Sequence, residues 1–129
     1  MSARSFADAR LMETWAHGLD CHAALGSAPV DTDRLRRIAG LGFRALPYAF
    51  SLTQDQPPGD VRTIALDLRA PDGTPWRYGP AGTADVIAGP AGEWCRVATR
   101  RRRAEDTSLR AATPLAALAL KVARAYLAD

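Results

Sequence analysis

The chain contains few of the residues that build disulfide and metal sites. Its 129 residues include 2 cysteines and 2 histidines, and Cys21 and Cys95 lie far apart in the sequence. These cysteines match no paired metal-binding spacing, and two lone cysteines are typical of reduced thiols in a cytoplasm. The cysteine content therefore argues against a disulfide framework and indicates a cytoplasmic protein.

The chain also lacks a long apolar segment. No run approaches the roughly 18 consecutive apolar residues that a membrane-spanning helix needs. Residues 1–6 lead directly into a polar helix, without the apolar core of a signal peptide. Hydrophobic residues make up 47% and charged residues 24%, which is ordinary for a soluble globular protein. We expect one domain, or one domain with a helix borrowed from a larger assembly, and no membrane partner.

Positive charge is concentrated in one place. The formal net charge is +3, and the four arginines at 100–103 exceed that excess on their own. A nucleic-acid site would have to rest on this run, but Glu105 and Asp106 follow at once and no aromatic residue is interleaved. Cations at the end of a helix also complement its dipole. We therefore do not expect nucleic acid as a partner, and the alternative is that one or two of these arginines turn inward to hold an anionic substrate.

Hydrophobic periodicity predicts an α+β fold. Helices are expected at 5–25 and about 31–45, ended by Gly26 and by Pro47. Two more helices are expected at 91–102 and from Pro114 to Tyr126, the last capped by Thr113. Alternating residues between them predict an antiparallel sheet of three to four strands, covered by helices on one face. The expected strands cover 48–52, 64–68, 76–78 and 84–88, with a turn at 71–74.

The segment 11–26 is the part of the chain that suggests chemistry. One side of its predicted helix carries an apolar stripe made of Met12, Trp15, Ala16, Leu19 and Ala23. Gly18 lies inside the same helix, where it either allows a neighbouring helix or ligand to approach closely or is simply tolerated at a cost of about 1 kcal/mol.

A polar cluster lies beside this stripe. At about 100° per residue, Glu13, His17 and Asp20 fall within an arc of about 60°. A carboxylate and an imidazole one turn apart can bind the same divalent ion, and a second carboxylate can orient the imidazole. The alternative is a solvated polar face. The helix supplies only two ligands, with Cys21 either a possible soft ligand or a small buried residue, so a catalytic zinc site needs a ligand from elsewhere.

This segment resembles the last bundle helix of the mycothiol-dependent maleylpyruvate isomerase family, in the DinB-like metal-dependent superfamily. The similarity extends to the small α/β domain that follows the bundle in that family, and it covers only the C-terminal half of a usual member. It rests on ETWAHGLD at 13–20, RALPYAF at 44–50, APDGTPW at 70–76, IAGPA at 87–91 and TRR at 99–101.

The resemblance implies a division into residues 1–26, the last helix of a metal-binding bundle, and residues 27–129, a small C-terminal α/β domain. It implies that Glu13 and His17 bind zinc or another divalent metal and that Asp20 is the neighbouring acidic residue of the active site. It also implies a catalytic arginine, best matched by Arg101, with Arg100 and Arg102 as alternatives. Mycothiol or a similar thiol would be the cosubstrate of an isomerase or transferase acting on a small molecule.

The first bundle helices and their ligand histidine have no counterpart in this sequence. We therefore expect the C-terminal part of a split or truncated enzyme, incomplete without a companion bundle chain or a second copy in a homo-oligomer. The alternative is a non-catalytic small-molecule-binding or accessory domain of the same family. A third hypothesis, nucleic-acid association, depends on residues 100–103 alone.

Overall fold

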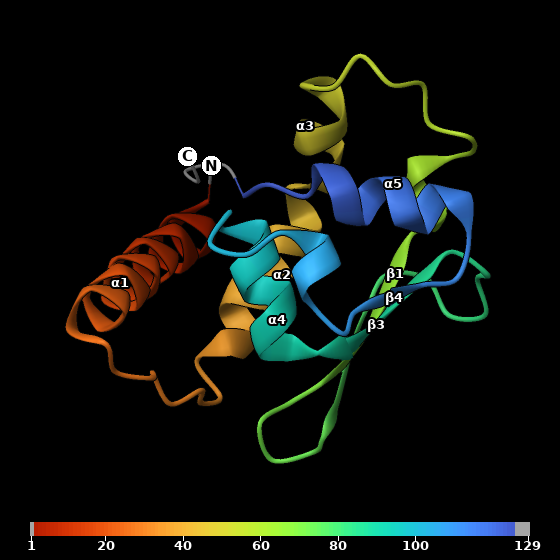
Figure 1. Cartoon of the computed structure of the whole chain (residues 1–129). Helices are drawn as coiled ribbons and strands as arrows, with labels where there is room; N and C mark the ends of the chain where they lie inside the picture. Colours follow the sequence, from red (N-terminus) through yellow and green to blue (C-terminus); the bar gives the residue numbers. More distant parts are fainter. Residues whose placement is uncertain (1, 126–129) are drawn as a thin grey trace.

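Helices cover one face of a four-stranded sheet in the computed structural model, which describes residues 2–125 (Figure 1). The predicted α+β class is confirmed. The helices are α1 (Ala3–Leu25), α2 (Leu35–Arg44), α3 (Leu46–Ser51), α4 (Ala91–Ala98) and α5 (Pro114–Val122), with 3-10 turns at Val61–Thr63 and Ala104–Asp106. The strands are β1 (Ala65–Arg69), β2 (Pro75–Tyr78), β3 (Val86–Pro90) and β4 (Arg110–Ala111).

Two predicted helix ends are confirmed by their capping contacts. Gly26 ends α1 in the left-handed conformation, with φ 70°, and its N–H bonds back to the carbonyl of Ala23. The Thr113 side chain accepts a hydrogen bond from the Ala116 N–H at 3.1 Å, and Pro114 begins α5. This helix was predicted to reach Tyr126 but ends at Val122, because Ala123 has extended backbone angles (φ −49°, ψ 128°); Tyr126 itself lies outside the described residues.

The strand order is β2-β1-β3-β4. β1 and β2 form the predicted antiparallel hairpin, with Leu68 opposite Trp76. The sheet is mixed and not wholly antiparallel, because β3 pairs with β1 in parallel on the side opposite β2. The loop after β2 carries the chain past the start of β1, where Asp85 accepts hydrogen bonds from the hydroxyls of Thr63 (2.5 Å) and Thr113 (2.7 Å). These bonds hold the pKa of Asp85 below its usual value and fix the crossing that makes the pairing parallel.

The strand predicted at 48–52 is wrong, because this segment forms α3. Pro47 lies in the first turn of α3, where its missing N–H costs nothing. Leu46, Ala49 and Phe50 are buried, which is the i, i+3, i+4 spacing of a helix. The alternation of Tyr48, Phe50 and Leu52 was misleading, since Tyr48 and Leu52 are exposed. The fourth strand is β4, which the sequence did not indicate.

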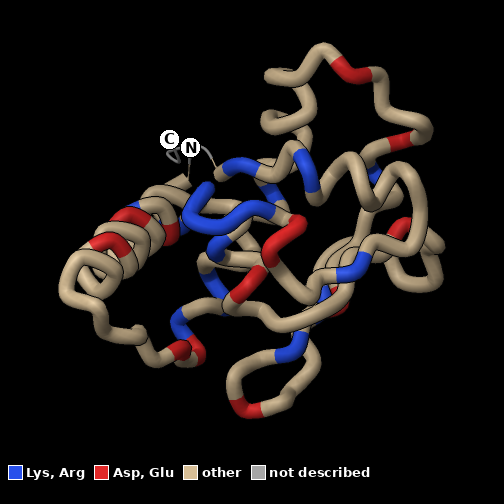
Figure 2. The backbone as a smooth tube through the Cα atoms, viewed as in Figure 1, with Lys and Arg blue, Asp and Glu red and all other residues tan. Residues whose placement is uncertain are grey.

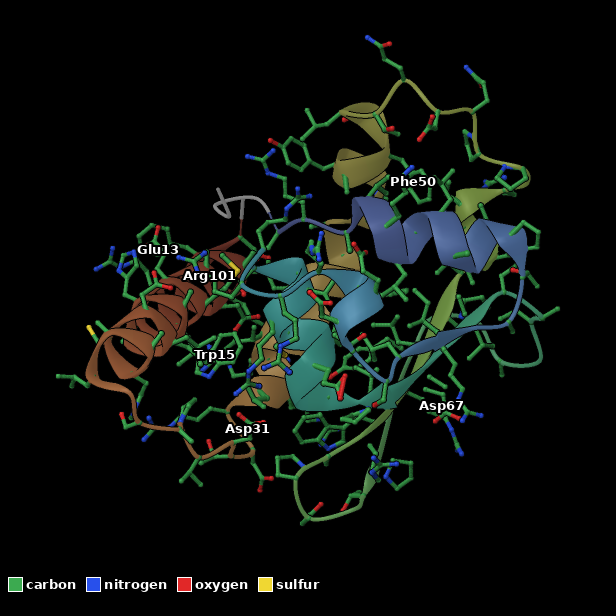
Figure 3. The ribbon with its side chains drawn as sticks, in the orientation of Figure 1. Glu13, Trp15, Asp31, Phe50, Asp67 and Arg101 are labelled. Carbon is green, nitrogen blue, oxygen red and sulfur yellow. The ribbon has the colours of Figure 1, made fainter. Side chains whose placement is uncertain are left out.

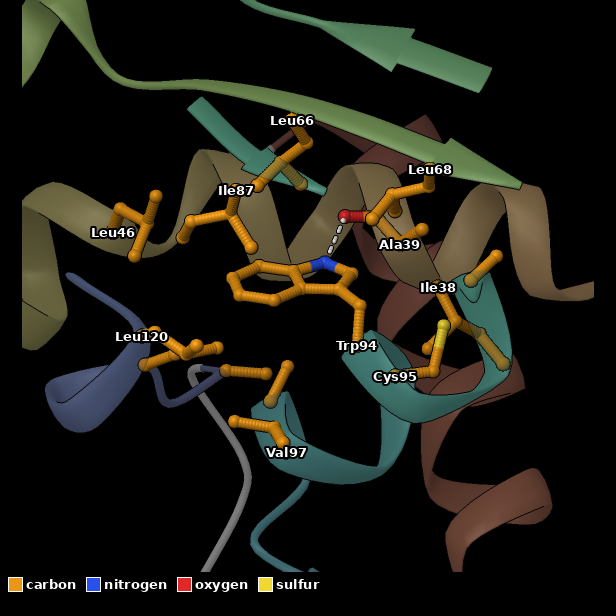
Figure 4. Packing of buried hydrophobic residues seen from close by; sticks show 14 of the residues in the cluster. Ile38, Ala39, Leu46, Leu66, Leu68, Ile87, Trp94, Cys95, Val97 and Leu120 are labelled. Carbon is orange, nitrogen blue, oxygen red and sulfur yellow. Dashed lines mark hydrogen bonds between the residues drawn. The ribbon is translucent and has the colours of Figure 1, made fainter. Parts of the chain in front are cut away.

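The core between the helices and the sheet is centred on Trp94 of α4 (Figure 4). Its indole contacts the buried layer that Leu66, Leu68 and Ile87 contribute from the sheet. The indole Nε1 donates to the carbonyl of Ala39 in α2 at 3.2 Å, so the one polar atom of this large side chain is satisfied. Alternation in β1 leaves Asp67 and Arg69 on the opposite, exposed face.

Candidate functional site

The outward side of α1 carries the predicted metal ligands. Buried residues of α1 lie on its inward side and include Met12, Ala16 and Leu19 of the predicted stripe. Trp15 is half-buried, and Ala23, predicted to belong to the stripe, is exposed. Glu13, labelled in Figure 3, is partly exposed. His17 is exposed. Both ligand-type side chains therefore remain accessible from solvent.

Glu13 already has a partner on its own helix. One guanidinium nitrogen of Arg10 donates to Glu13 Oε2 at 3.1 Å, and the Glu13 side chain is 31% exposed. An i,i+3 pair of this kind contributes only about 0.2–0.5 kcal/mol. A metal ion could displace Arg10 at small cost, because Arg10 is itself largely exposed.

Asp20 is held by Arg101, so the two residues predicted to be catalytic contact each other. Arg101 Nη2 donates to Asp20 Oδ2 at 3.0 Å and Nε donates to Oδ1 at 3.3 Å, a bidentate pair. These hydrogen bonds, with the positive charge of Arg101, hold the pKa of Asp20 below its usual value, and His17 lowers it further. The pair with Arg101 therefore favours the ionised form of Asp20.

The way in which α4 ends determines the orientation of the Arg101 side chain. The helix was predicted to continue to 102, but it stops at Ala98, where Thr99 Oγ1 turns back to the carbonyl of Cys95. Arg100 follows in the left-handed conformation, with φ 63°. The N–H of Arg101 then bonds to the carbonyl of Arg96 at 2.8 Å, and that of Arg100 to Val97 at 3.0 Å. This is a Schellman ending, and it directs the guanidinium of Arg101 toward α1.

The remaining candidate ligands of α1 do not join the cluster. Cys21, predicted as a buried residue or soft ligand, is exposed. His22 is half-buried and its Nδ1 is 2.7 Å from the hydroxyl of Ser27. Within residues 2–125, no group of three or more His, Cys, Asp or Glu side chains is close enough to hold a metal ion. Imidazole and carboxylate are suitable zinc ligands, so the donor types fit a metal but their number is too small within this part of the chain.

Sequence reasoning missed two contacts that fix α1 against the body of the protein. Asp8 is buried, and it accepts hydrogen bonds from Arg37 (2.7 Å) and Arg44 (3.0 Å) of α2. The signal was present: Asp8 lies one turn before Met12 on the buried stripe, and the facing helix is rich in arginine.

The second contact involves Trp15. The guanidinium of Arg96 lies 5.5 Å from the Trp15 ring centroid, a cation–π distance. The same guanidinium forms two hydrogen bonds with the carboxylate of Asp31, at 3.0 and 3.1 Å. No local sequence pattern indicates such a contact, because it joins residues from three separate segments. Figure 3 shows Trp15 and Asp31 on neighbouring elements.

Comparison with known proteins gives relatives without a described function. Two uncharacterized proteins from two strains of Mycobacterium tuberculosis are each 42% identical to this chain over 126 residues. The match covers 98% of this chain and 48% of each relative, so the chain spans about half the length of these curated relatives. No family model and no solved structure matches the chain significantly. Among the described helices, none is both long enough and apolar enough to cross a membrane.

Proposed function

We propose that this chain contributes Glu13 and His17 to a divalent-metal site of a thiol-dependent isomerase or transferase acting on a small molecule. In this proposal residues 1–26 serve as the last helix of a metal-binding bundle and residues 27–129 as its small α/β domain. The observation that carries the proposal is the outward cluster on α1, where Glu13 and His17 are accessible and Asp20 is fixed beside them by Arg101. The resemblance to the mycothiol-dependent maleylpyruvate isomerase family supports the same assignment.

Each of these residues has a proposed role. His17 and Glu13 would bind zinc or a similar ion, and the bound metal would lower the pKa of a thiol such as mycothiol. Asp20 would keep the imidazole of His17 oriented, and Arg101 would hold Asp20 ionised and in place. The same guanidinium is close to the proposed metal ligands and can contribute positive charge for an anionic substrate group.

A further ligand has to come from outside the described residues. Three sources are consistent with the proposal: a companion bundle chain, another segment of a longer chain, or a second copy in a homo-oligomer. The relatives support the second source, because about half of their length lies outside the matched segment. Gly18 supports the approach of a neighbouring element, since a Cβ at that position would meet no described atom within 4 Å apart from its chain neighbours and the nearby backbone of α1.

A zinc titration followed by NMR tests the proposal on the chain itself. We expect the imidazole signals of His17 and the amides near Glu13 to shift, while those of His22 stay in place. An E13A/H17A variant should lose this response and an H22A variant should keep it, because His22 is engaged by Ser27. Unchanged His17 signals at millimolar zinc, or a response centred on His22, would contradict the proposed ligand set.

The second candidate function is a non-catalytic small-molecule-binding or accessory domain. The ion pair between Arg10 and Glu13 favours it, because this carboxylate already has a cationic partner on α1. Full retention of cellular activity by the E13A/H17A variant would support this alternative over the metal site.

A further inference from the structure

The arginine segment (residues 100–103) borders a concave surface that does not include the outward cluster on α1. A pocket of about 640 Å³ lies between residues 100–106 and α5. Its cationic lining consists of the arginine segment and Lys121, and its apolar lining includes Val97 and Leu120. A volume of this size suits a small organic molecule. Figure 2 shows the positive charge of the arginine segment as a continuous stretch beside α1.

The cations around the pocket are not all neutralised. Arg101 pairs with Asp20, Arg103 pairs with Glu105 and Asp106, and Lys121 lies 3.9 Å from Asp55. Arg100 and Arg102 form no ion pair with any residue between 2 and 125. Two guanidiniums on one short segment thus remain available to an external anion, and each can bind a phosphate through two parallel hydrogen bonds.

Arg100 lines the pocket from a left-handed backbone conformation. At a φ of 63°, a residue with a side chain is less favourable than glycine, and glycine is the usual residue at this position of a Schellman ending. Strained positions of this kind cluster at binding sites, where a side chain has a use that offsets the strain. Arg100 also borders a neighbouring hollow beside α3, together with Lys121, so its side chain lies between two concave surfaces.

The apolar part of the lining shows what kind of anion fits. The apolar lining consists of the accessible Ala104 and Ala117 over the largely buried Leu120, Val97 and Ala123, and a purely inorganic anion would not use it. We propose that this pocket binds a phosphate monoester with an apolar organic group. Arg100 and Arg102 bind the phosphate, Lys121 adds charge from α5, and the organic group packs on Leu120 and Val97. Arg101 also lines this pocket, but its guanidinium is engaged by Asp20, so the phosphate site uses Arg100 and Arg102 and does not require the proposed metal ligands.

A nucleic acid fits the pocket less well. Among residues 2–125, no aromatic side chain on which bases would stack lines it, and Glu105 and Asp106 place negative charge in its lining. A monocarboxylate would also use fewer of the available cations than a phosphate dianion does. The charge and the apolar lining together favour a small phosphate monoester.

Binding of phenyl phosphate, inorganic phosphate and benzoate by calorimetry, in the presence of a chelator, tests the proposal without involving a metal. Phenyl phosphate should bind at least about tenfold more tightly than either other probe, since inorganic phosphate lacks the apolar group and benzoate has the ring but only one negative charge. Its affinity should fall at high salt, because exposed charges are screened.

Two variants separate binding from folding. R100G removes a guanidinium while retaining a residue suited to the left-handed backbone, and R102Q removes the other cation outside any helix. Each should weaken phenyl phosphate binding by about tenfold or more, while thermal unfolding shows an intact fold. The control is R34Q/R110Q, which removes two exposed arginines that do not line the pocket.

Three outcomes would overturn the inference. The first is equal affinity for phenyl phosphate and inorganic phosphate, which would remove the apolar subsite. The second is an equal loss of phenyl phosphate binding in R34Q/R110Q and in the pocket variants, which would show that binding depends on the net charge of the protein and not on this pocket. The third is tight binding of a single-stranded oligonucleotide that depends on Arg100 and Arg102 in the absence of phenyl phosphate binding, which would make this surface a nucleic-acid site.

Discussion

Asp20 and Arg101 lie 81 positions apart in the chain, yet they form a bidentate ion pair across the contact between α1 and the end of α4. Asp20 is 56% exposed and Arg101 24% exposed, so the guanidinium is the more enclosed partner. The pair joins the outward cluster on α1 to the α/β part of the protein. It therefore connects the position of the proposed metal ligands to the way α4 ends.

The first prediction concerns the titration of Asp20. An R101Q variant should raise the pKa of Asp20 toward the usual value of about 3.9, measured by NMR on the side-chain carboxyl. The native pKa is lowered by the hydrogen bonds and charge of Arg101, so the contribution of the pair to stability is present above the unfolded-state pKa and is lost as pH falls through the folded-state pKa. R101Q should therefore make stability less dependent on pH in this acid range. Asp60 is the internal control, because Arg62 holds its pKa low and should continue to do so.

The second prediction concerns the buried carboxylate of Asp8. A double-mutant cycle on Asp8 and Arg37 should give a coupling energy of about 1–3 kcal/mol, because the Asp8 side chain is only 3% exposed. The same cycle on Arg103 and Glu105, whose side chains are 74% and 66% exposed, should give less than about 0.5 kcal/mol. Urea unfolding measures both. Equal coupling energies would show that burial does not strengthen the Asp8 contact.

The third prediction compares two glycines inside helices. G18A should raise the free energy of unfolding by about 1 kcal/mol, because alanine favours the helix and the position is open. G42A should lower it by about 1–3 kcal/mol, because the new Cβ would lie 2.9 Å from Ala98 Cβ at the contact between α2 and α4. Should a neighbouring element approach α1 closely at Gly18, G18A would stabilise the isolated chain while weakening that association. Thermal unfolding and sedimentation separate the two effects.

The fourth prediction concerns the backbone at Arg100. R100G should stabilise the fold by about 0.5–1 kcal/mol, because glycine adopts the left-handed conformation without strain. R102G is the matched comparison, since Arg102 has no positive φ, and it should leave the free energy of unfolding unchanged or lower it. Destabilisation by R100G would mean that the Arg100 side chain contributes packing that outweighs the strain.

Local signals in the sequence predicted the features that depend on neighbouring residues. The end of α1 was predicted from Gly26, and the start of α5 from Thr113 and Pro114. Both predictions were correct because capping uses groups within a few positions of each other. The hairpin of β1 and β2 followed from alternation around a Pro-Asp-Gly turn. The segment 48–52 was misassigned because so short a segment does not separate the helical from the strand period, and the burial of Leu46 and Phe50 selects the helix.

Features that depend on distant residues could not be predicted in this way. The parallel pairing of β1 and β3 requires the loop after β2 to cross the start of β1, which no local pattern encodes. The helical face of Glu13, His17 and Asp20 was predictable from spacing, but the fixation of Asp20 by Arg101 was not. The ending of α4 at Ala98 was hidden because an arginine occupies the position where glycine usually marks the end.

The contacts that fasten α1 are graded along its length. Asp8, near the start, is buried with two arginines, Trp15 in the middle is half-buried against Arg96, and Asp20, near the end, is mostly exposed. Helix α1 should therefore detach from its Gly26 end first and pivot about the turn that holds Asp8, so amide exchange slows from residue 25 toward residue 8. The C-terminal part of α1, which carries His17 and Asp20, can then move toward an incoming partner while the N-terminal part stays attached through Asp8.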